Sequence, residues 1–335
     1  MEKNLSALGF MSGTSGDGVD TSVISSNGKD TINIKYNRFD PYPTSLSNKI
    51  HRVKESISKM QDLLKYSSEI DKLELEITDF HIDIAIKATK EVDYDLIGFH
   101  GHTIYHNTEE KISKQIGLGA NLSKLTNKDV VYNFRQNDIK NGGEGAPLSP
   151  IYHLALIKSL FNENKVKIPI SILNIGGIAN ITEIEKDFKI TSRDIGPGNC
   201  LIDKWIRKNS DKFFDENGTL ADKGKTDKFI FDQYLDNYYY SKVNSKRSLD
   251  TNDFDISFAK GLSLENGTAT ITDLTSELLS KKIGINDIYI CGGGRKNKYL
   301  INSLKKKINN KLHLIDDLNI DGDYIESQAF AFLAI

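Results

Sequence analysis

The sequence predicts an α/β protein of two domains around a cleft, on three observations. The chain has 335 residues, which is long enough for two packed domains that each bury a core. Strand-like and helix-like hydrophobic patterns alternate along it without low-complexity linkers. A strand, a glycine turn and a second strand open the chain, and the same arrangement recurs from Ile170. We therefore expect the second domain to begin much as the first does.

In the first half, Leu5–Phe10 and Val19–Ile24 have the short apolar pattern of strands on either side of a glycine turn. A polar connection is expected from there to about Thr44. Apolar residues then recur at helical spacing between Ser45 and Lys90, which predicts two or three helices. The remaining predicted elements of this half are the strands Leu96–Phe99 and Asp129–Asn133, with a polar loop after the second.

In the second half, a double-glycine turn is predicted to join two strands between Ile170 and Ile184. Asp194–Trp205 is predicted to be a turn that leads into a helix. The other predicted elements are the helices Asp227–Tyr240, Leu274–Ile283 and Tyr299–Ile308, and the strand Asp287–Cys291, which ends in three glycines.

Composition and charge exclude several classes of protein. The formal net charge of −2 gives no electrostatic basis for nucleic acid or an anionic membrane as a partner. No run approaches the ~20 apolar residues that span a bilayer. The N-terminus lacks the apolar region of a secretory signal, so a cytoplasmic location is expected. The two cysteines, Cys200 and Cys291, are expected to be reduced, buried thiols.

The stretch FMSGTSGDGVD (Phe10–Asp20) is either an ordinary hairpin turn or a cradle for a small anion. Its glycines leave backbone N–H groups unobstructed, and its hydroxyl side chains add donors, a combination that suits phosphate oxygens. Asp17 and Asp20 would repel phosphate unless a divalent cation lay between them. The stretch does not match the phosphate-binding pattern G-x-x-x-x-G-K-[ST], which is excluded.

Two further glycine turns follow predicted strands, in Asn174–Asn180 (NIGGIAN) and Cys291–Asn297 (CGGGRKN). Glycines at such positions allow the backbone to approach a phosphate or a planar ligand closely. One such turn alone is more often structural than functional. Three in one chain, all at strand ends, favour a nucleotide-binding cleft.

Several polar residues lie where a ligand could be bound. Asp194, in RDIGPGN, is either a turn-forming residue or an acid that points into a cleft. Glu326 precedes an apolar helical run, where the helix dipole alone would favour a carboxylate. Arg135 and Asp138 lie in a segment that is too polar for a core. They could form a surface ion pair, or Arg135 could bind a carboxylate or phosphate of a ligand.

Three histidines, His100, His102 and His106, lie close together in HGHTIYH. A zinc site would need them on one face of a strand, and no cysteine or carboxylate stands at conventional zinc spacing. Histidines that form hydrogen bonds near a polar ligand are the favoured interpretation, with a structural zinc as the alternative.

Seven motifs, in this order, make the chain resemble the anhydro-N-acetylmuramic acid kinase family. Together they extend from Gly9 nearly to the last residue. The first motif, followed later in the sequence by GGxGAPL and DxGPGN, is too specific to arise by chance. The motifs are Gly9–Asp20, Ile97–His106, Asn133–His153, Leu173–Asn180, Asp194–Asp203, Cys291–Asn297 and Glu326–Ala334.

The resemblance implies two related ribonuclease H-like domains, of the ATPase type of actin and hexokinase, around a central nucleotide and sugar cleft. It places residues 1–134 and a C-terminal helix at about 323–335 in the first domain, and residues 135–322 in the second. It also implies a homodimer, with ATP and Mg²⁺ as cofactors and Asp17 holding the ion through water. The residues that it implies for ATP binding are Gly13, Thr14, Ser15, Gly16, Asp17, Gly18, Val19, Asp20, Gly176, Gly177, Asn180, Gly196, Gly198, Asn199, Gly292, Gly293 and Gly294.

The implied reaction converts 1,6-anhydro-N-acetylmuramic acid and ATP into N-acetylmuramic acid 6-phosphate and ADP, in peptidoglycan recycling. Water adds at the anomeric carbon and opens the anhydro bridge, while the freed 6-oxygen takes the γ-phosphoryl group. Asp194 matches the family's catalytic base for that water. The residues that match the sugar pocket are Thr103, Arg135, Asp138 and Glu326, with Arg135 meeting the lactyl carboxylate.

Four positions, His102, Asn133, Glu144 and Thr251, depart from the residues usual in the family (Gln, Asp, Gln and Arg), which bears on the substrate range. Three other functions remain open. The first is a related sugar kinase with an altered substrate. The second is a glycoside hydrolase with Asp194 and Glu326 as its acid–base pair. The third is a non-catalytic nucleotide-binding protein of the same fold.

Overall fold

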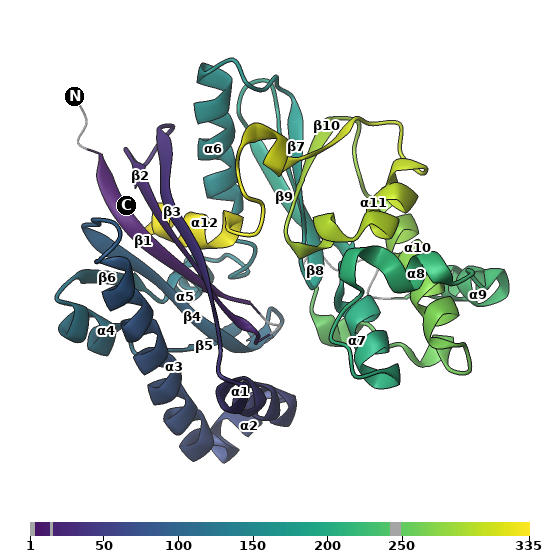
Figure 1. The fold of residues 1–335 in the computed structure, drawn as a ribbon, viewed down its shortest axis with the longest axis horizontal. Coiled ribbons are helices and arrows are strands. Elements are labelled where there is room, and N and C mark those ends of the chain that lie inside the picture. Colours follow the sequence, from purple (N-terminus) through teal and green to yellow (C-terminus); the bar gives the residue numbers. More distant parts are fainter. Residues whose placement is uncertain (1–3, 14–15, 242–248) are drawn as a thin grey trace. The chain divides into compact units, whose positions relative to one another are not determined.

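The computed structural model, drawn in Figure 1, describes residues 4–13, 16–241 and 249–335. The chain divides into two compact units. The first contains Met1–Val166 and Tyr324–Ile335, and the second contains Lys167–Asp323. The chain thus leaves the first unit after Val166 and returns to it with its last helix.

The first unit is built on a six-stranded mixed sheet. Its strands are β1 (Leu5–Ser12), β2 (Gly18–Ser26), β3 (Ile32–Pro41), β4 (Leu96–Asn107), β5 (Ile112–Ile116) and β6 (Asp129–Tyr132). β1, β2 and β3 form an antiparallel meander, whereas β1 and β6 each pair parallel with β4. β5 pairs antiparallel with the second half of β4.

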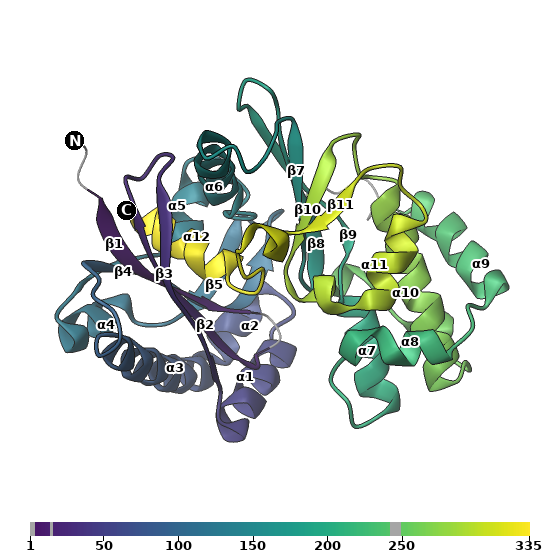
Figure 2. The ribbon, with the colours of Figure 1, turned by 45° about the horizontal axis from the view of Figure 1, so that its top comes forward.

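Helices pack on both faces of this sheet. They are α1 (Thr44–Ser56), α2 (Met60–Lys65), α3 (Ser67–Ala88), α4 (Gly119–Thr126), α5 (Phe134–Lys140), α6 (Pro150–Asn162) and α12 (Ile325–Ala334). The core on one face joins Leu8 and Phe10 of β1 to Ile50 of α1 and Ile77 of α3. α1 and α3 form here because their apolar residues recur at helical spacing and bury one stripe. Figure 2 shows α3 and α12 on opposite sides of the sheet.

α12 packs directly against strand backbones, because glycines face it. A Cβ added to Gly9 of β1 would lie 2.1 Å from the carbonyl oxygen of Ser327, and one added to Gly98 of β4 would lie 2.1 Å from that of Phe330. The hydroxyls of Ser327 and Ser22 of β2 also form a hydrogen bond (2.7 Å). Glycine therefore determines how closely the last helix approaches the sheet.

We expect Gly98→Ala to lower the free energy of unfolding by about 3 kcal/mol or more, because a backbone carbonyl cannot rotate away from the added methyl group as a side chain would. Chemical denaturation measures the difference. Gly293→Ala is the matched control, since a Cβ at Gly293 has nothing within 4 Å. Equal stability of Gly98→Ala and the wild type would show that α12 does not dock this closely.

The second unit is built on a five-stranded sheet. Its strands are β7 (Ile170–Ile175), β8 (Ile178–Ile184), β9 (Ile190–Pro197), β10 (Asp287–Cys291) and β11 (Leu312–Leu314). Its helices are α7 (Cys200–Asn209), α8 (Thr219–Lys223), α9 (Lys228–Tyr239), α10 (Leu264–Ser280) and α11 (Lys298–Lys305). One core joins Leu173 of β7 to Leu300 of α11, and a second joins Trp205 of α7 to Ile271 of α10.

Both sheets have the same strand order and orientations. In the second unit β7, β8 and β9 form the antiparallel meander, and β7 and β11 each pair parallel with β10. The order β11-β10-β7-β8-β9 thus corresponds to β6-β4-β1-β2-β3 of the first unit. The recurrence of the opening pattern at Ile170 predicted this repeat, and the expectation of two related α/β domains is confirmed.

Several segments differ from the sequence-based expectation: β4 continues past Phe99 to Asn107, and α4, α6, β5 and β11 are among the elements that were not expected. The expected polar connection before Thr44 contains β3, an edge strand whose side chains are mostly half-buried or exposed, so it has no apolar strand pattern. The expected loop after Asn133 begins with α5, which buries no residue and therefore lacks an apolar stripe. Asp194–Pro197, expected in a turn, are the last residues of β9.

The first boundary between the compact units differs from the expected domain boundary after residue 134. The chain crosses after Val166 instead, because α5 and α6 pack on the first unit. Nε of Arg135 in α5 donates to Nε2 of His100 (2.7 Å), and the hydroxyl of Tyr152 in α6 donates to Oε1 of Gln328 in α12 (2.7 Å). Contacts made far along the chain thus determine to which unit these helices belong.

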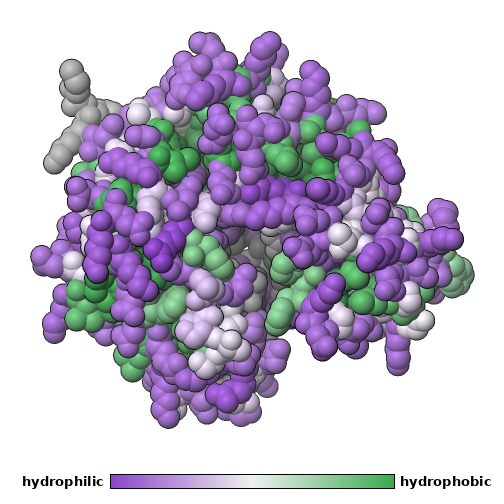
Figure 3. Space-filling view, in the orientation of Figure 1, coloured by the Kyte–Doolittle hydropathy of each residue, from purple (hydrophilic) through white to green (hydrophobic). Residues whose placement is uncertain are grey.

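One face of the molecule is mostly polar, and the two thiols lie inside. Hydrophilic side chains cover most of the face seen in Figure 3. Within the part of the chain that the structure describes, no helix is both long and apolar enough to cross a bilayer. Cys200 and Cys291 are buried and form no disulfide, as expected, and burial raises the pKa of the Cys200 thiol to about 12.

Candidate active site

The first glycine turn joins β1 to β2 and is held by its own backbone and by α1. The N–H of Gly16 donates to the carbonyl of Gly13 (3.1 Å), and Oγ of Ser47 in α1 donates to the carbonyl of Gly16 (2.7 Å). Gly16 has φ +63°, a backbone conformation that favours glycine. Two of the residues expected to bind ATP, Thr14 and Ser15, lie outside the described residues.

The expected ATP-binding segment continues into β2. Gly18 leaves no room for a side chain, since a Cβ there would lie 2.5 Å from the carbonyl oxygen of Asp40. The side chain of Val19 is fully buried in the core, so only its backbone can face a ligand. Asp17 is exposed and Asp20 is half-buried. The segment therefore offers backbone groups and an exposed carboxylate, which suits a phosphate accompanied by a cation.

Arg135 and Asp138 of α5 bind the glycine-rich segment that follows the helix. Nη1 of Arg135 donates to the carbonyl of Gly145 (2.7 Å), and Oδ2 of Asp138 accepts from the N–H of Gly145 (2.7 Å). Both side chains belong to half-buried residues. They shape this loop and keep a positive and a negative charge at its surface, so they do more than form a surface ion pair.

Thr103 and Glu326 belong to the same unit as Arg135. Oγ1 of half-buried Thr103 in β4 accepts from Nε2 of Gln115 (3.1 Å), and half-buried Glu326 lies in the first turn of α12. The imidazole of His100 connects the three elements. It accepts from Arg135 of α5 and packs on the ring of Phe330 in α12, with ring centroids 4.4 Å apart. His100 thus connects Arg135 to the helix that carries Glu326, and Thr103 lies three residues after His100 on the same strand.

His100 and His102 of β4 are neutral hydrogen-bonding groups. Burial, helped by the charge of Arg135, lowers the pKa of His100 well below its ordinary value, and burial lowers the pKa of His102 to about 3. Among the described residues, no group of three or more His, Cys, Asp or Glu side chains could hold a metal ion. The structure thus favours the hydrogen-bonding interpretation over a structural zinc.

In the second unit, the β7–β8 turn and the β9–α7 turn bind each other through backbone groups. The N–H of Gly198 donates to the carbonyl of Gly177 (2.9 Å), and the N–H of Asn199 donates to that of Gly176 (2.8 Å). A Cβ on Gly198 would lie 2.1 Å from the carbonyl oxygen of Gly176. The two expected ATP-binding turns thus form one backbone surface at the N-terminus of α7, where the helix dipole favours an anion.

Asp194 lies on β9, close to this surface along the chain. Asp194 is 9% exposed, and its Oδ2 accepts a hydrogen bond from the N–H of Leu249 (2.8 Å). Across the sheet it is the register partner of Asn180, next to an irregularity at Ala179. Oδ1 of Asn180 is buried without a hydrogen-bond partner in the described part of the chain. Asp194 therefore sits on a strand as an oriented, buried carboxylate, and the helix after it is preceded by Asn199 as its N-cap residue.

The glycine turn after β10 packs against β7. Gly292 has φ +79°, and a Cβ there would lie 2.3 Å from Oδ1 of Asn174. A Cβ on Gly294 would lie 2.2 Å from Cγ2 of Ile175, whereas one on Gly293 has nothing within 4 Å. Packing thus requires two of the three glycines, and only Gly293 leaves open space beside the backbone.

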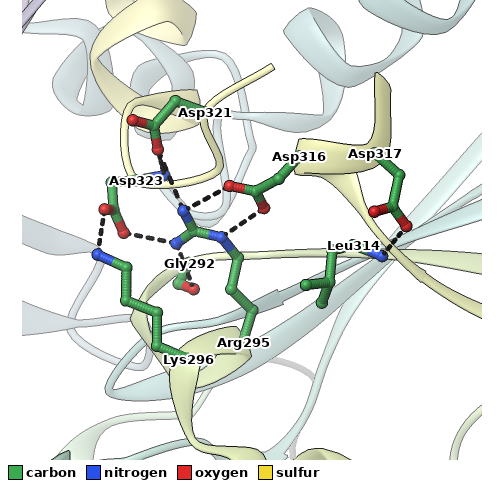
Figure 4. A network of polar contacts seen from close by, with 8 residues as sticks. All are labelled: Gly292, Arg295, Lys296, Leu314, Asp316, Asp317, Asp321 and Asp323. Atoms are coloured by element: carbon green, nitrogen blue, oxygen red, sulfur yellow. Dashed lines mark hydrogen bonds and ion pairs between the residues drawn. The ribbon is translucent and has the colours of Figure 1, made fainter. Parts of the chain in front are cut away.

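Arg295, directly after this turn, has a buried side chain at the centre of an ionic network that the sequence-based expectation did not include. Figure 4 shows its guanidinium between three aspartates. Nε and Nη2 bind both oxygens of Asp316 (2.7 and 3.0 Å), Nη2 binds Asp321 (3.1 Å) and Nη1 binds Asp323 (2.5 Å). Lys296 also pairs with Asp323. The acidic run DDLNIDGD was the available signal, but its pairing with Arg295 depends on the fold.

The repeated strand order, with glycine turns after β1, β7 and β10, defines the class of protein. It is a two-domain ribonuclease H-like protein of the ATPase type that includes actin and hexokinase. A family model described as "Anhydro-N-acetylmuramic acid kinase" matches residues 5–335. The chain belongs to the anhydro-N-acetylmuramic acid kinase family.

Curated relatives support this assignment over the whole chain. The chain is 46% identical over 350 residues to an anhydro-N-acetylmuramic acid kinase of Pelagibacter ubique, covering 100% of this chain and 92% of the relative. It is 34% identical over 343 residues to the protein of the same name from Rhizobium johnstonii, covering 98% of this chain and 91% of the relative.

Solved structures with lower similarity also match nearly the full length. One is component A of the (R)-2-hydroxyglutaryl-CoA dehydratase of Acidaminococcus fermentans, at 13% identity and a TM-score of 0.47, with 98% of this chain and 97% of the other covered. Another is a ROK family glucokinase of Streptomyces griseus, at 10% identity and a TM-score of 0.43, with 98% of each chain covered. At these scores the family assignment rests on the sequence comparisons alone.

Proposed function

We propose that this protein is an ATP-dependent kinase that hydrolytically opens 1,6-anhydro-N-acetylmuramic acid and phosphorylates its 6-oxygen. The products are N-acetylmuramic acid 6-phosphate and ADP, in peptidoglycan recycling. Membership of the family over residues 5–335 supports the class of reaction. The observation that carries the mechanism is Asp194, a buried carboxylate oriented by the N–H of Leu249.

In this proposal Asp194 is the general base for water. The bridging oxygen of an anhydro sugar carries no proton, so the proton to be removed belongs to the attacking water. As Asp194 takes it, the water oxygen bonds to the anomeric carbon and the bond from that carbon to the 6-oxygen breaks. The 6-oxygen then bonds to the γ-phosphorus, and the bond from that phosphorus to ADP breaks. Atoms and charge balance without a further reactant.

The other expected site residues bind and orient the two substrates. The Gly13–Asp20, Gly176–Gly177 and Gly196–Asn199 turns would lie against the phosphates, where their glycines allow close approach and the N-terminus of α7 favours an anion, with Asn180 beside them. The Gly292–Gly294 turn would hold the adenosine side. The four residues proposed for the sugar are Arg135, for its lactyl carboxylate, and Thr103, Asp138 and Glu326, for its hydroxyl and amide groups.

Asp17 fits a magnesium ion that keeps most of its water. Mg²⁺ is usually bound through one or two carboxylates and the phosphates of a nucleotide, and Asp17 is an exposed carboxylate at the end of the first glycine turn. When bound, Mg²⁺ offsets the charge of the transferred phosphoryl group. Asp17 would orient the ion's water shell while the turn holds the phosphates.

We further propose a cytoplasmic location, where ATP is available, and a homodimer.

The test is a product assay with the purified protein, ATP, Mg²⁺ and the anhydro sugar in ¹⁸O-labelled water. We expect a 6-phosphorylated sugar with the label at the anomeric hydroxyl, because that oxygen comes from water. Ring opening without ATP would support a glycoside hydrolase instead. ATP binding without sugar turnover would support a non-catalytic nucleotide-binding protein. Turnover of a different sugar only would support a kinase with an altered substrate.

A further inference from the structure

A buried chain of hydrogen bonds lies at the base of the first glycine turn. Nδ1 of His102 in β4 and Oγ of Ser12 are 2.8 Å apart, and the same Oγ is 2.9 Å from the hydroxyl of Tyr42. His102 is 0% exposed, Ser12 2% and Tyr42 6%. Ser12 is the last residue of β1, so these hydrogen bonds fix the residue from which the turn begins. Polar groups buried this completely are rigid when they bind one another.

The same network of hydrogen bonds also reaches the other end of the turn. The backbone N–H of Tyr42 donates to the carbonyl of Asp17 (2.9 Å), the residue just before β2. Tyr42 thus binds Ser12 through its hydroxyl and Asp17 through its backbone. His102 binds Ser12, which in turn binds the hydroxyl of Tyr42. Both ends of the turn are therefore tied to one buried network, while α1 binds its middle at Gly16.

His102 can act on the turn because β4 lies beside β1. Ser12 and His102 are register partners after an irregularity in the β1–β4 pairing. Gly101 has φ +74°, and a Cβ there would lie 2.4 Å from the carbonyl oxygen of Ile116. The backbone just before His102 is thus set by β5, which fixes where the imidazole points. Nε2 of His102 has no hydrogen-bond partner within the described residues, so its Nδ1 bond to Ser12 is its polar anchor.

We propose that His102 is a positioning residue, which acts through Ser12 and Tyr42 to hold Ser12 and Asp17, the two ends of the first glycine turn, where the turn can receive the phosphates of ATP. The inference rests on the proposed function, since it assigns the turn to ATP. It goes beyond that function because His102 touches neither substrate in the proposed mechanism. The side chain acts on nucleotide binding at a distance, and the sugar side is unaffected.

His102→Leu removes the Nδ1 bond and keeps an apolar volume, and His102→Asn keeps a polar atom near the place of Nδ1. We expect His102→Leu to raise the KM for ATP and the Kd for a non-hydrolysable ATP analogue roughly tenfold, the effect of one lost buried hydrogen bond. The KM for the sugar should stay within about twofold of the wild type, and His102→Asn should restore most of the ATP affinity. Tyr42→Phe, which removes only the hydroxyl, should raise the same two constants and guards against a His102→Leu variant that does not fold.

His81→Leu is the matched control. His81 is fully buried in the same unit, with its pKa lowered by burial to about 4, but its Nδ1 bonds to the carbonyl of Ile77 in its own helix. Its substitution should leave the KM for ATP unchanged. An equal rise in His81→Leu, or no rise in either His102→Leu or Tyr42→Phe, would overturn the inference. If the wild type bound the ATP analogue with this His102 dependence but phosphorylated no sugar, the inference would stand and the proposed function would fail.

Discussion

Asp194→Asn is expected to bind ATP and the anhydro sugar but to lower kcat on the order of 10³-fold, the usual scale for a lost general base. The amide has the shape of the carboxylate, and its oxygen can still accept the hydrogen bond that Leu249 donates to Oδ2. It cannot take a proton from water. The fold and both binding sites should therefore persist while the chemical step stops. Steady-state kinetics, with calorimetry for the two Kd values, measure each part.

Asp215→Asn is the matched control for Asp194→Asn. Asp215 is also a buried aspartate of the second unit, and its two oxygens accept from the backbone N–H groups of Leu220 (2.7 Å) and Ala221 (3.0 Å). Its role is structural, so its amide variant should lose stability and keep kcat. If Asp194→Asn turned over at the wild-type rate, Asp194 would not be the base. If both variants lost kcat equally, the loss would reflect damage to the unit.

Arg295→Ala is expected to destabilise the second unit by about 2 kcal/mol, because a buried guanidinium loses its charged hydrogen bonds while the three aspartates left behind stay partly exposed to water. The side chain of Arg295 is 5% exposed and binds three aspartates. Without it, Asp316, Asp321 and Asp323 lie together without their shared cation. The last of these directly precedes the crossing to Tyr324. Urea denaturation followed by far-UV circular dichroism measures the change.

Arg295→Lys separates charge from geometry, because lysine keeps the cation but cannot form the two-oxygen contact with Asp316. We expect its stability to fall between those of the wild type and Arg295→Ala. Lys296→Ala is the control: its side chain is 58% exposed and its ammonium also pairs with Asp323, so its removal should cost less than about 1 kcal/mol. Equal losses in Lys296→Ala and Arg295→Ala would contradict the central role of Arg295.

The effect of Arg295 should depend on pH in a defined direction. Burial by itself would raise the pKa values of Asp316 and Asp323, but the hydrogen bonds and charge of Arg295 outweigh it and hold both below the ordinary value. A carboxyl whose folded-state pKa is lowered adds stability above its unfolded pKa of about 4. That stability is lost as the pH falls through the folded-state pKa. The difference between wild type and Arg295→Ala should therefore be full at pH 7 and shrink below about pH 4.

Local patterns predicted the glycine turns, because each turn directly follows a short apolar strand. The same patterns could not say what each glycine does. Gly292 and Gly294 are required by packing against Asn174 and Ile175, and only Gly293 has open space. Gly9 and Gly98 were not singled out at all, since their role depends on a helix near the other end of the chain.

Two of the missed elements have weak periodicity. β3 is an edge strand and α5 buries no residue, so neither has the apolar pattern by which a strand or helix is recognised. The expected domain boundary after residue 134 came from the resemblance. Hydrogen bonds from Arg135 to His100 and from Tyr152 to Gln328 place α5 and α6 in the first unit instead.

The sequence by itself determined two related α/β domains and three glycine turns, because short motifs carry this information within a few residues of each other. Through the family resemblance it also gave Asp194 as the candidate base. Only the tertiary structure decided which side chains hold those motifs in place. Ser12 and His102 are 90 positions apart, and Arg295 finds its three aspartates 21 to 28 positions away. Such partners meet because strand order and helix packing bring them together, and no local pattern encodes a contact over that distance.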